Sequence, residues 1–242
     1  MLGEYIDIHN HILPGVDDGA KSMEETIAML EVAISQGIST MIATPHYECG
    51  RPGVSIKELN EIKEKVEEEA KKLNPHFTLY LGHELMYSDS LLEDVKGKKA
   101  LTLGETRYVL IEFSIGITYE AMYEGMKRFV NAGYLPIIAH MERYHCLRKN
   151  TEGILDLIDL GCYMQMNSST LTGGIFDRES TGFKKLVMEG YIHFIASDSH
   201  DRKNRIPCMK RIADSLSKKL DKARLDTIFI QNPKKLLENK YI

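Results

Sequence analysis

The sequence predicts an α/β protein of the barrel type, with about seven strand–helix units along its 242 residues. Short apolar runs alternate with longer segments in which apolar residues recur every three or four positions. Continuous apolar strands of this kind are typical of a parallel sheet that helices cover on the outside. An open doubly wound sheet is the alternative, but histidines stand after the first strand, where its Gly-rich phosphate loop would lie. The unbroken series of units therefore favours a closed, TIM-like barrel in one domain, residues 1–242.

Capping signals locate the first two helices. The first is predicted to begin after Ser22, because Ser22 and Glu25 have capping-box spacing, and to end at Gly37. A second box, Ser55 with Glu58, begins the next helix, whose many charges fit a solvent-exposed face. Further helices are expected between most of the later strands, with two or three after the last. The strands are predicted at residues 5–9, 38–46, 77–84, 107–113, 134–140, 162–167 and 193–198.

Composition argues against several classes of function. The formal charge of −4 and the pI near 6.2 give no reason to expect nucleic acid as a partner. No apolar run approaches the roughly 18 residues of a membrane span, and the N-terminus lacks a secretory signal, so we expect a cytoplasmic protein. The cysteines lack the spacing of metal ligands or of a disulfide framework and are expected to be reduced thiols. They are Cys49, Cys146, Cys162 and Cys208.

Metal-competent side chains stand at the predicted carboxyl ends of successive strands. In a parallel barrel these ends open onto one face, so the side chains are expected to meet in space. Residues i and i+2 of an extended segment point the same way about 6.6 Å apart, so His9 can act with His11, and Asp198 with His200. The set is His9, His11, His46, Glu84, Glu112, His140, Asp198 and His200.

The donor atoms of this set indicate a cluster of metal ions. Imidazole nitrogens and carboxylate oxygens without a thiolate suit manganese, iron or zinc. Eight or nine ligands are too many for one ion, so two or three ions that share a carboxylate are expected, and such clusters activate water for hydrolysis.

Several other residues do not have this strand-end placement. Among the remaining histidines, His83 and His193 are interpreted as structural, His76 has no assigned role, and His145 is left open as a neighbour of the site. The loop of residues 48–55 either borders the pocket and selects the substrate or serves only as a connection.

The order of these motifs resembles the PHP (polymerase and histidinol phosphatase) family. The matching segments run from end to end and read HNH, DDGA, TPH, GHE, IEF, HMER and SDSH. More narrowly, the chain resembles the manganese-dependent protein-tyrosine phosphatases found with capsule and exopolysaccharide genes of Gram-positive bacteria. That likeness is carried by DIHNHILPGVDDGAKS, ATPHY, LIEFS, HMERY and ASDSHDRKNR. The resemblance implies a distorted (β/α)7 barrel. One departure is Met141, where the family usually has proline, and it could shift Arg143 slightly.

The resemblance also implies three manganese ions, although iron or zinc would suit the same ligands. Glu84 would bridge two ions, and Asp18 joins the ligands. Asp17 is instead expected to cap the turn before Gly19. The three implied sets are His9, His11, Glu84 and Asp198; Glu84, Glu112 and His140; and Asp18, His46 and His200.

Arg143 and Arg205 are the expected catalytic residues, because related phosphatases have arginine at both matching places. A guanidinium offers two parallel donors to phosphate oxygens. The hypothesis is that a metal-activated hydroxide attacks phosphorus in line and that tyrosine leaves. Cysteine-dependent catalysis needs a cysteine five residues before an arginine, and the sequence contains no such pair.

The implied partner is a membrane-associated bacterial tyrosine kinase with a tyrosine-rich tail, whose dephosphorylation would tune polysaccharide export. The nearest alternative is a phosphatase of histidinol phosphate or another small molecule, although that branch tends to place histidine where Asp18 stands. A proofreading or repair nuclease would need a basic groove. A non-catalytic metal-bound regulatory module is the alternative of another class.

Overall fold

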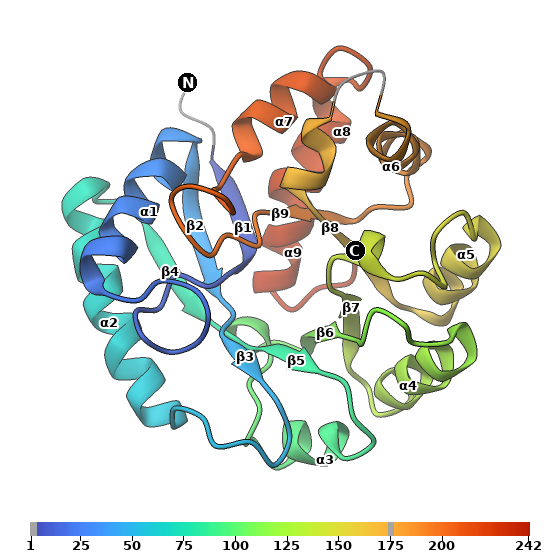
Figure 1. Ribbon diagram of the computed structural model, residues 1–242, viewed down its shortest axis with the longest axis horizontal. Coiled ribbons are helices and arrows are strands. Elements are labelled where there is room, and N and C mark those ends of the chain that lie inside the picture. The colour runs from blue at the N-terminus through green and yellow to red at the C-terminus, as the bar shows by residue number, and fades with distance from the viewer. Residues whose placement is uncertain (1–3, 174–176) are drawn as a thin grey trace.

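The computed structural model describes residues 4–173 and 177–242. Within these ranges the chain has a mixed α/β fold whose paired strands are parallel, and the strands curl inside a ring of helices (Figure 1). The strands are β1 (Tyr5–Asn10), β2 (Ile38–Ala43), β3 (His46–Tyr47), β4 (Thr78–Leu81), β5 (Glu84–Met86), β6 (Tyr108–Glu112), β7 (Leu135–Ile138), β8 (Tyr163–Asn167) and β9 (Phe194–Ala196). The helices are α1 (Met23–Ser35), α2 (Ile56–Leu73), α3 (Leu91–Lys96), α4 (Tyr119–Asn131), α5 (Thr151–Leu160), α6 (Arg178–Glu189), α7 (Met209–Leu216), α8 (Lys222–Asp226) and α9 (Asn232–Leu237).

The strands form two parallel sheets. Their orders are β1-β2-β4 and β3-β5-β6-β7-β8-β9. Backbone hydrogen bonds also join the end of β1 to the segment after β9: Asp198 N donates to His9 O at 2.8 Å, and His11 N donates to Ser199 O at 2.9 Å. The first and last strands of the chain therefore meet, and they bring one histidine pair beside Asp198.

Two runs predicted as single strands, residues 38–46 and 77–84, are each divided between the two sheets. Pro45 has no N–H for the ladder and stands between β2 and β3. Gly82 stands between β4 and β5, where a Cβ would lie 2.7 Å from a neighbouring side chain. The predictions that His46 and Glu84 end strands were therefore wrong, because His46 begins β3 and Glu84 begins β5.

Two apolar cores stabilise the fold. Successive residues of β6 alternate between them: Val109 and Ile111 belong to the larger core, and Tyr108 and Leu110 belong to the smaller one. The two cores therefore lie on opposite faces of the strands. The smaller core also contains Leu236 of α9, whose contribution ties the chain's last helix to the strands.

Both predicted N-caps are confirmed, but the capping box is complete only at α2, because at α1 the Glu25 side chain accepts from Lys21 N at 2.8 Å instead of from Ser22 N. Glu25 N donates to Ser22 Oγ at the start of α1, and Ser55 with Glu58 forms a complete capping box at α2. Gly37 follows α1 with a φ of 80°, a conformation that favours glycine. No helix in the described ranges is long and apolar enough to cross a membrane.

His193 is structural, as predicted. Its Nδ1 accepts a hydrogen bond from Met164 N at 3.1 Å, and its carbonyl accepts one from Asn232 Nδ2 at 2.9 Å. These bonds connect the start of β9 to β8 and α9. Burial, with a smaller contribution from the charge of Arg224, lowers the pKa of His193 from 6.5 to about 4.

This pKa difference makes His193 a source of acid sensitivity. Between pH 6.5 and 4 the unfolded chain binds a proton at His193 that the folded chain does not, so stability falls as the pH falls through this window. His193→Gln keeps a hydrogen-bond acceptor but cannot titrate. We expect its free energy of unfolding to fall by about 2–3 kcal/mol less than that of the parent between pH 6.5 and 4. Urea unfolding of chelator-treated protein at several pH values measures this. The exposed histidine in His76→Gln is the control, and the same pH slope in the parent and in His193→Gln would contradict the prediction.

Candidate metal centre

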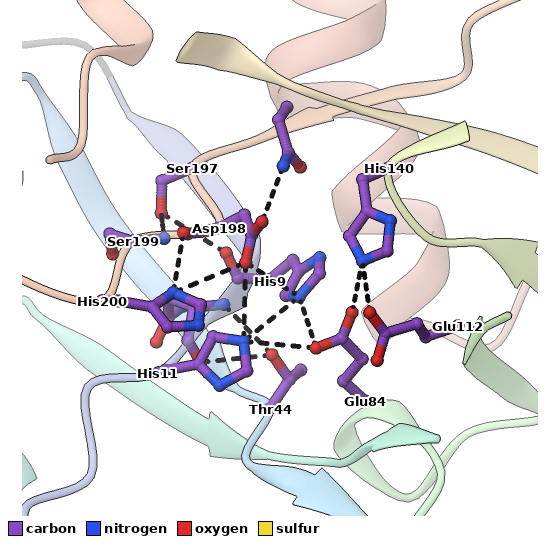
Figure 2. Close-up of polar contacts among 12 residues, drawn as sticks. His9, His11, Thr44, Glu84, Glu112, His140, Ser197, Asp198, Ser199 and His200 are labelled. Atoms are coloured by element: carbon purple, nitrogen blue, oxygen red, sulfur yellow. Dashed lines mark hydrogen bonds and ion pairs between the residues drawn. The ribbon is translucent and has the colours of Figure 1, made fainter. Parts of the chain in front are cut away.

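The structure brings together all nine residues predicted as ligands, at one end of the strands. Each contacts at least one other member through a nitrogen–oxygen pair within 4.0 Å. Figure 2 shows most of them pointing toward one another. Asp18 and His46 are open to solvent, whereas His9, His11 and Glu84 are buried. The cluster comprises His9, His11, Asp18, His46, Glu84, Glu112, His140, Asp198 and His200.

The carboxylate of Glu84 lies at the centre of this cluster. Its Oε2 is 3.3 Å from Nε2 of both His9 and His11. The same oxygen is 3.1 Å from Nδ1 of His46, and Oε1 is 2.7 Å from Nε2 of His140. A carboxylate that contacts imidazoles on both oxygens has the arrangement of a bridging ligand.

Three groups of donor atoms are each compact enough to hold a cation, with all ligand atoms within 4.8 Å of one another. They are His9, His11 and Glu84; His46, Glu84 and Glu112; and His11, Asp18, His46 and His200. These groups overlap the three sets implied by the sequence without matching them. His140 and Asp198 belong to none of these groups, but His140 contacts Glu84 and Asp198 contacts His9.

Polar atoms without hydrogen-bond partners also indicate that the cluster can hold metal ions. Nε2 of His9 and Nε2 of His11 face each other at 3.4 Å, and Oδ1 of Asp198 and Nε2 of His200 are buried without a hydrogen-bond partner among the described residues. Unpartnered buried polar atoms are rare and costly in folded proteins. A cation coordinated by these nitrogen and oxygen atoms would satisfy them.

Charge within the cluster is balanced by pairing carboxylates with imidazoles. Burial opposes the ionisation of Glu84, but the charge of His9 and hydrogen bonds from His11 and His140 outweigh it, so the pKa of Glu84 lies well below its usual range. Burial likewise opposes the protonation of His140, but Glu112 and Glu84 raise its pKa to about 10. Metal ions would compete with these protons for the same nitrogens, so metal binding releases protons.

Asp17 caps the turn, as predicted, and also orients two histidines. Its Oδ1 accepts from Gly19 N at 2.9 Å, and its Oδ2 lies 2.7 Å from His11 Nδ1 and accepts from His46 N at 3.2 Å. A Cβ at Gly19 would lie 2.0 Å from the carbonyl oxygen of His11, so this position has no room for a side chain. The two adjacent acids therefore have different roles: Asp17 supports the cluster from behind, and Asp18 is part of it.

Two amide side chains that the sequence-based prediction missed support the cluster from β8. Gln165 Oε1 accepts from His140 N at 2.7 Å and lies 3.2 Å from His9 Nδ1. Asn167 Nδ2 donates to Asp198 Oδ2 at 2.6 Å, and Gln165 Nε2 donates to Asn167 Oδ1 at 3.0 Å. Both side chains are buried. The signal was two amides at i and i+2 in an otherwise apolar strand.

Asp7 is a second residue that the prediction missed. Its carboxylate accepts from Ser197 N at 2.9 Å and from Ser197 Oγ at 2.6 Å, which ties β1 to the end of β9. Burial raises the pKa of Asp7 to about 6, although the hydrogen bonds from Ser197 oppose this shift. Sequence inspection gave no reason to separate this acid from a surface residue at the start of a strand.

Arg143 and Arg205 lie at the edge of the cluster. Nη2 of Arg205 donates to Oδ2 of Asp198 at 2.5 Å, and Nη1 of Arg143 is 4.0 Å from Oε1 of Glu112. Both side chains are partly exposed. Arg143 N donates to His140 O at 2.9 Å in the turn that also contains Met141.

The geometry agrees with the comparison with known proteins. Residues 5–238 match the family described as capsular polysaccharide synthesis, CpsB/CapC. The chain belongs to the CpsB/CapC family. It is 34% identical to the tyrosine-protein phosphatase CpsB of Streptococcus pneumoniae, over 98% of this chain and all of that protein.

Solved structures agree with this membership. The fold matches the crystal structures of YwqE from Bacillus subtilis and CpsB from Streptococcus pneumoniae, described as metal-dependent tyrosine phosphatases, with a TM-score of 0.88 and 31% identity over 98% of this chain and 96% of that chain. A phosphotriesterase homology protein from Escherichia coli, 13% identical over 98% of this chain and 99% of that chain, has a TM-score of 0.57 and shares the fold alone.

The supporting role of Gln165 in this CpsB/CapC chain can be tested through metal affinity. Gln165→Leu removes the oxygen that fixes His140 N and His9 Nδ1, and we expect the affinity for Mn²⁺ to fall about 10- to 100-fold. Gln165→Glu keeps an acceptor oxygen and should retain most of the affinity. Isothermal titration of metal-stripped protein with Mn²⁺ measures both. Equal affinities for the parent and the leucine variant would show that the amide has no such role.

Proposed function

We propose that this chain is a metal-dependent protein-tyrosine phosphatase. The observation that carries the proposal is the convergence of nine imidazole and carboxylate side chains with two arginines at their edge, in a member of the CpsB/CapC family. A cluster of this kind suits hydrolysis at phosphorus. The name of the pneumococcal relative supports phosphotyrosine as the substrate.

The proposal extends to the metal ions and their ligands. Three manganese ions would be held by the cluster, with iron or zinc as alternatives, and Glu84 would be a ligand that two of them share. The contacts of Glu84 on both of its oxygens support this role. The ligands are His9, His11, Asp18, His46, Glu84, Glu112, His140, Asp198 and His200.

The finer description of the fold and of the partner belongs to the same proposal. If β2 with β3, and β4 with β5, each count as one kinked strand, the parallel strands form a distorted (β/α)7 barrel in a single domain, residues 1–242. The hydrogen bonds between the end of β1 and the segment after β9 support this closure. A bacterial tyrosine kinase of capsule or exopolysaccharide biosynthesis is the protein substrate, and the location is cytoplasmic. Both follow from the resemblance to capsule-locus phosphatases.

The reaction divides between the metal ions and the chain. When bound, divalent ions supply an activated water and neutralise charge on phosphoryl oxygens. Arg143 and Arg205 hold the equatorial phosphoryl oxygens, because a guanidinium presents parallel donors that match them. The ion pair with Asp198 fixes the position of Arg205. Arg143, with its nearest carboxylate oxygen 4.0 Å away, keeps its donors available for the substrate.

Cysteine chemistry does not fit this chain. A thiolate nucleophile needs a lowered pKa. Burial instead raises the pKa of Cys162 to about 12 and also raises the pKa of Cys146 and Cys208. None of the four cysteines precedes an arginine by five residues. The reaction therefore proceeds without a phosphocysteine intermediate.

Substrate preference and the role of Arg143 are tested together. We expect Mn²⁺-loaded protein to release phosphate from a phosphotyrosyl peptide with a kcat/KM well above that for histidinol phosphate. Arg143→Ala should lower the peptide value by about 100-fold, the scale for loss of one donor to a transition-state oxygen. Arg148→Ala, which removes an arginine paired with Glu179 outside the cluster, is the control. Preference for histidinol phosphate would overturn the substrate assignment but keep the metal cluster.

Metal and thiol dependence separate the two mechanisms of tyrosine dephosphorylation. EDTA should abolish activity, and added Mn²⁺ should restore it, because the chain offers no other source of an activated nucleophile. Replacement of all four cysteines by alanine should leave most of the activity, with unfolding monitored in parallel because Cys162 and Cys208 are buried. Full loss of turnover in a folded cysteine-free variant would refute the metal-dependent mechanism.

A further inference from the structure

A cavity of about 820 Å³ opens beside the metal centre. We call it the β3–α2 cavity, because residues of the loop between β3 and α2 form much of its wall. The 48–55 loop therefore borders a pocket, which was one of the two readings of the sequence. Its volume lies within the range of pockets that bind small molecules, about 300–1,000 Å³. The cavity shares Asp18, His46 and Glu112 with the metal cluster, so the two spaces are continuous.

Part of the cavity wall is apolar, and charged or polar residues form the rest. Its apolar residues are Pro45, Pro52, Val54, Ile56, Leu59 and Met86. Tyr47 stacks on His83 with ring centroids 5.2 Å apart and donates to Asp94 Oδ2 at 3.0 Å. His83 Nδ1 in turn accepts from Leu101 N at 3.0 Å. Two aromatic rings of the wall are therefore held in place by hydrogen bonds at their far sides.

The basic residues of the cavity are already paired. Arg51 lies 2.8 Å from Glu48, and Lys99 lies 3.3 Å from Asp94. The cavity therefore presents no excess of positive charge that would favour a nucleic acid or an anionic lipid surface. A cavity with an apolar wall and a polar end at the metal ligands suits a ligand that has an apolar part and a polar end.

The groups expected to hold phosphate lie elsewhere. Neither Arg143 nor Arg205 lines the β3–α2 cavity; each lies against a carboxylate of the cluster, Glu112 and Asp198 respectively. Arg143 lies beside Glu112, which also lines the cavity, so a phosphoryl group held at the cluster by the arginines would leave the adjoining cavity for the organic part of the ester. The volume is larger than one tyrosine ring requires and includes room for neighbouring residues.

We propose that the β3–α2 cavity binds the tyrosyl ring and the adjoining residues of a phosphotyrosyl peptide, and that the 48–55 loop selects this substrate. The inference rests on the proposed phosphatase function and adds the part of the molecule that recognises the peptide. A phosphorylated alkyl alcohol would leave the apolar wall uncovered and would gain less binding energy from it.

Gly53 offers a position at which a side chain can be added to the wall of this cavity. It lines the cavity, its φ is outside the left-handed region, and a Cβ built on it meets nothing within 4 Å. Larger side chains at this position therefore extend into open space without backbone strain. Gly182, an exposed residue of α6, also has open space at its Cβ and does not line the cavity. Figure 1 shows α6 apart from β3 and α2.

The experiment compares Gly53→Ala, Gly53→Leu and Gly53→Trp with the parent and with Gly182→Trp as the matched control. The readouts are KM for a phosphotyrosyl peptide and the inhibition constant of inorganic phosphate, which needs only the metal centre. We expect KM to rise with side-chain size, by about tenfold or more for tryptophan, the scale set by losing the burial of one apolar side chain. The inhibition constant should stay within about twofold, because phosphate lacks the part that the cavity would hold. The leucine variant keeps the test valid if the tryptophan variant unfolds.

The outcomes separate the two proposals. An unchanged peptide KM in folded Gly53 variants, or an equal rise in the phosphate inhibition constant, would overturn the cavity assignment while the phosphatase function stands. A parent protein that turns over no phosphotyrosyl peptide would overturn the proposed function and this inference with it.

Discussion

The buried carboxylate of Glu84 is the interaction on which the rest of the site depends. It contacts histidines from the segments after β1, at β3 and after β7. A charge removed from water at this depth is tolerated only when several partners surround it. Glu84 meets this requirement as the first residue of β5, directly after the break between β4 and β5. Successive side chains of a strand point to opposite faces of the sheet. A shift of one residue in the pairing of this segment would therefore turn the Glu84 side chain away from the histidines.

Two residues of the cluster have a strained backbone. His140 and Asp198 have positive φ angles of 30° and 50°, a conformation that residues other than glycine rarely adopt. Both residues contact the cluster, and both are held by amide side chains of β8, Gln165 and Asn167. At these two residues the strain lies in the turns after β7 and β9, each of which directs a side chain toward the cluster. Buried hydrogen bonds around these turns offset its cost.

The arginines and the β3–α2 cavity both adjoin the metal cluster, and this arrangement matters for its chemistry. The arginines lie against Glu112 and Asp198, and the β3–α2 cavity opens next to Asp18 and His46. Groups that would hold phosphate and a space that would hold an aromatic side chain thus flank the same donors. Binding energy from the apolar part of a substrate can then position the phosphoryl group at the cluster.

The sequence by itself determined the class of fold, the caps of the first two helices and eight of the nine clustered side chains, because periodicity, capping signals and polar residues beside apolar strands can be recognised in short segments. The ninth, Asp18, was expected only from the resemblance to a known family. Tertiary structure decided what these local signals cannot carry. It divided two predicted strands, placed Glu84 at the start of one, and recruited Asp7, Gln165 and Asn167, whose roles exist only through partners far along the chain. Hydrogen bonds between residues as distant as Asp7 and Ser197 depend on how the sheets curl, and that curl follows from the packing of the whole chain rather than from any one segment.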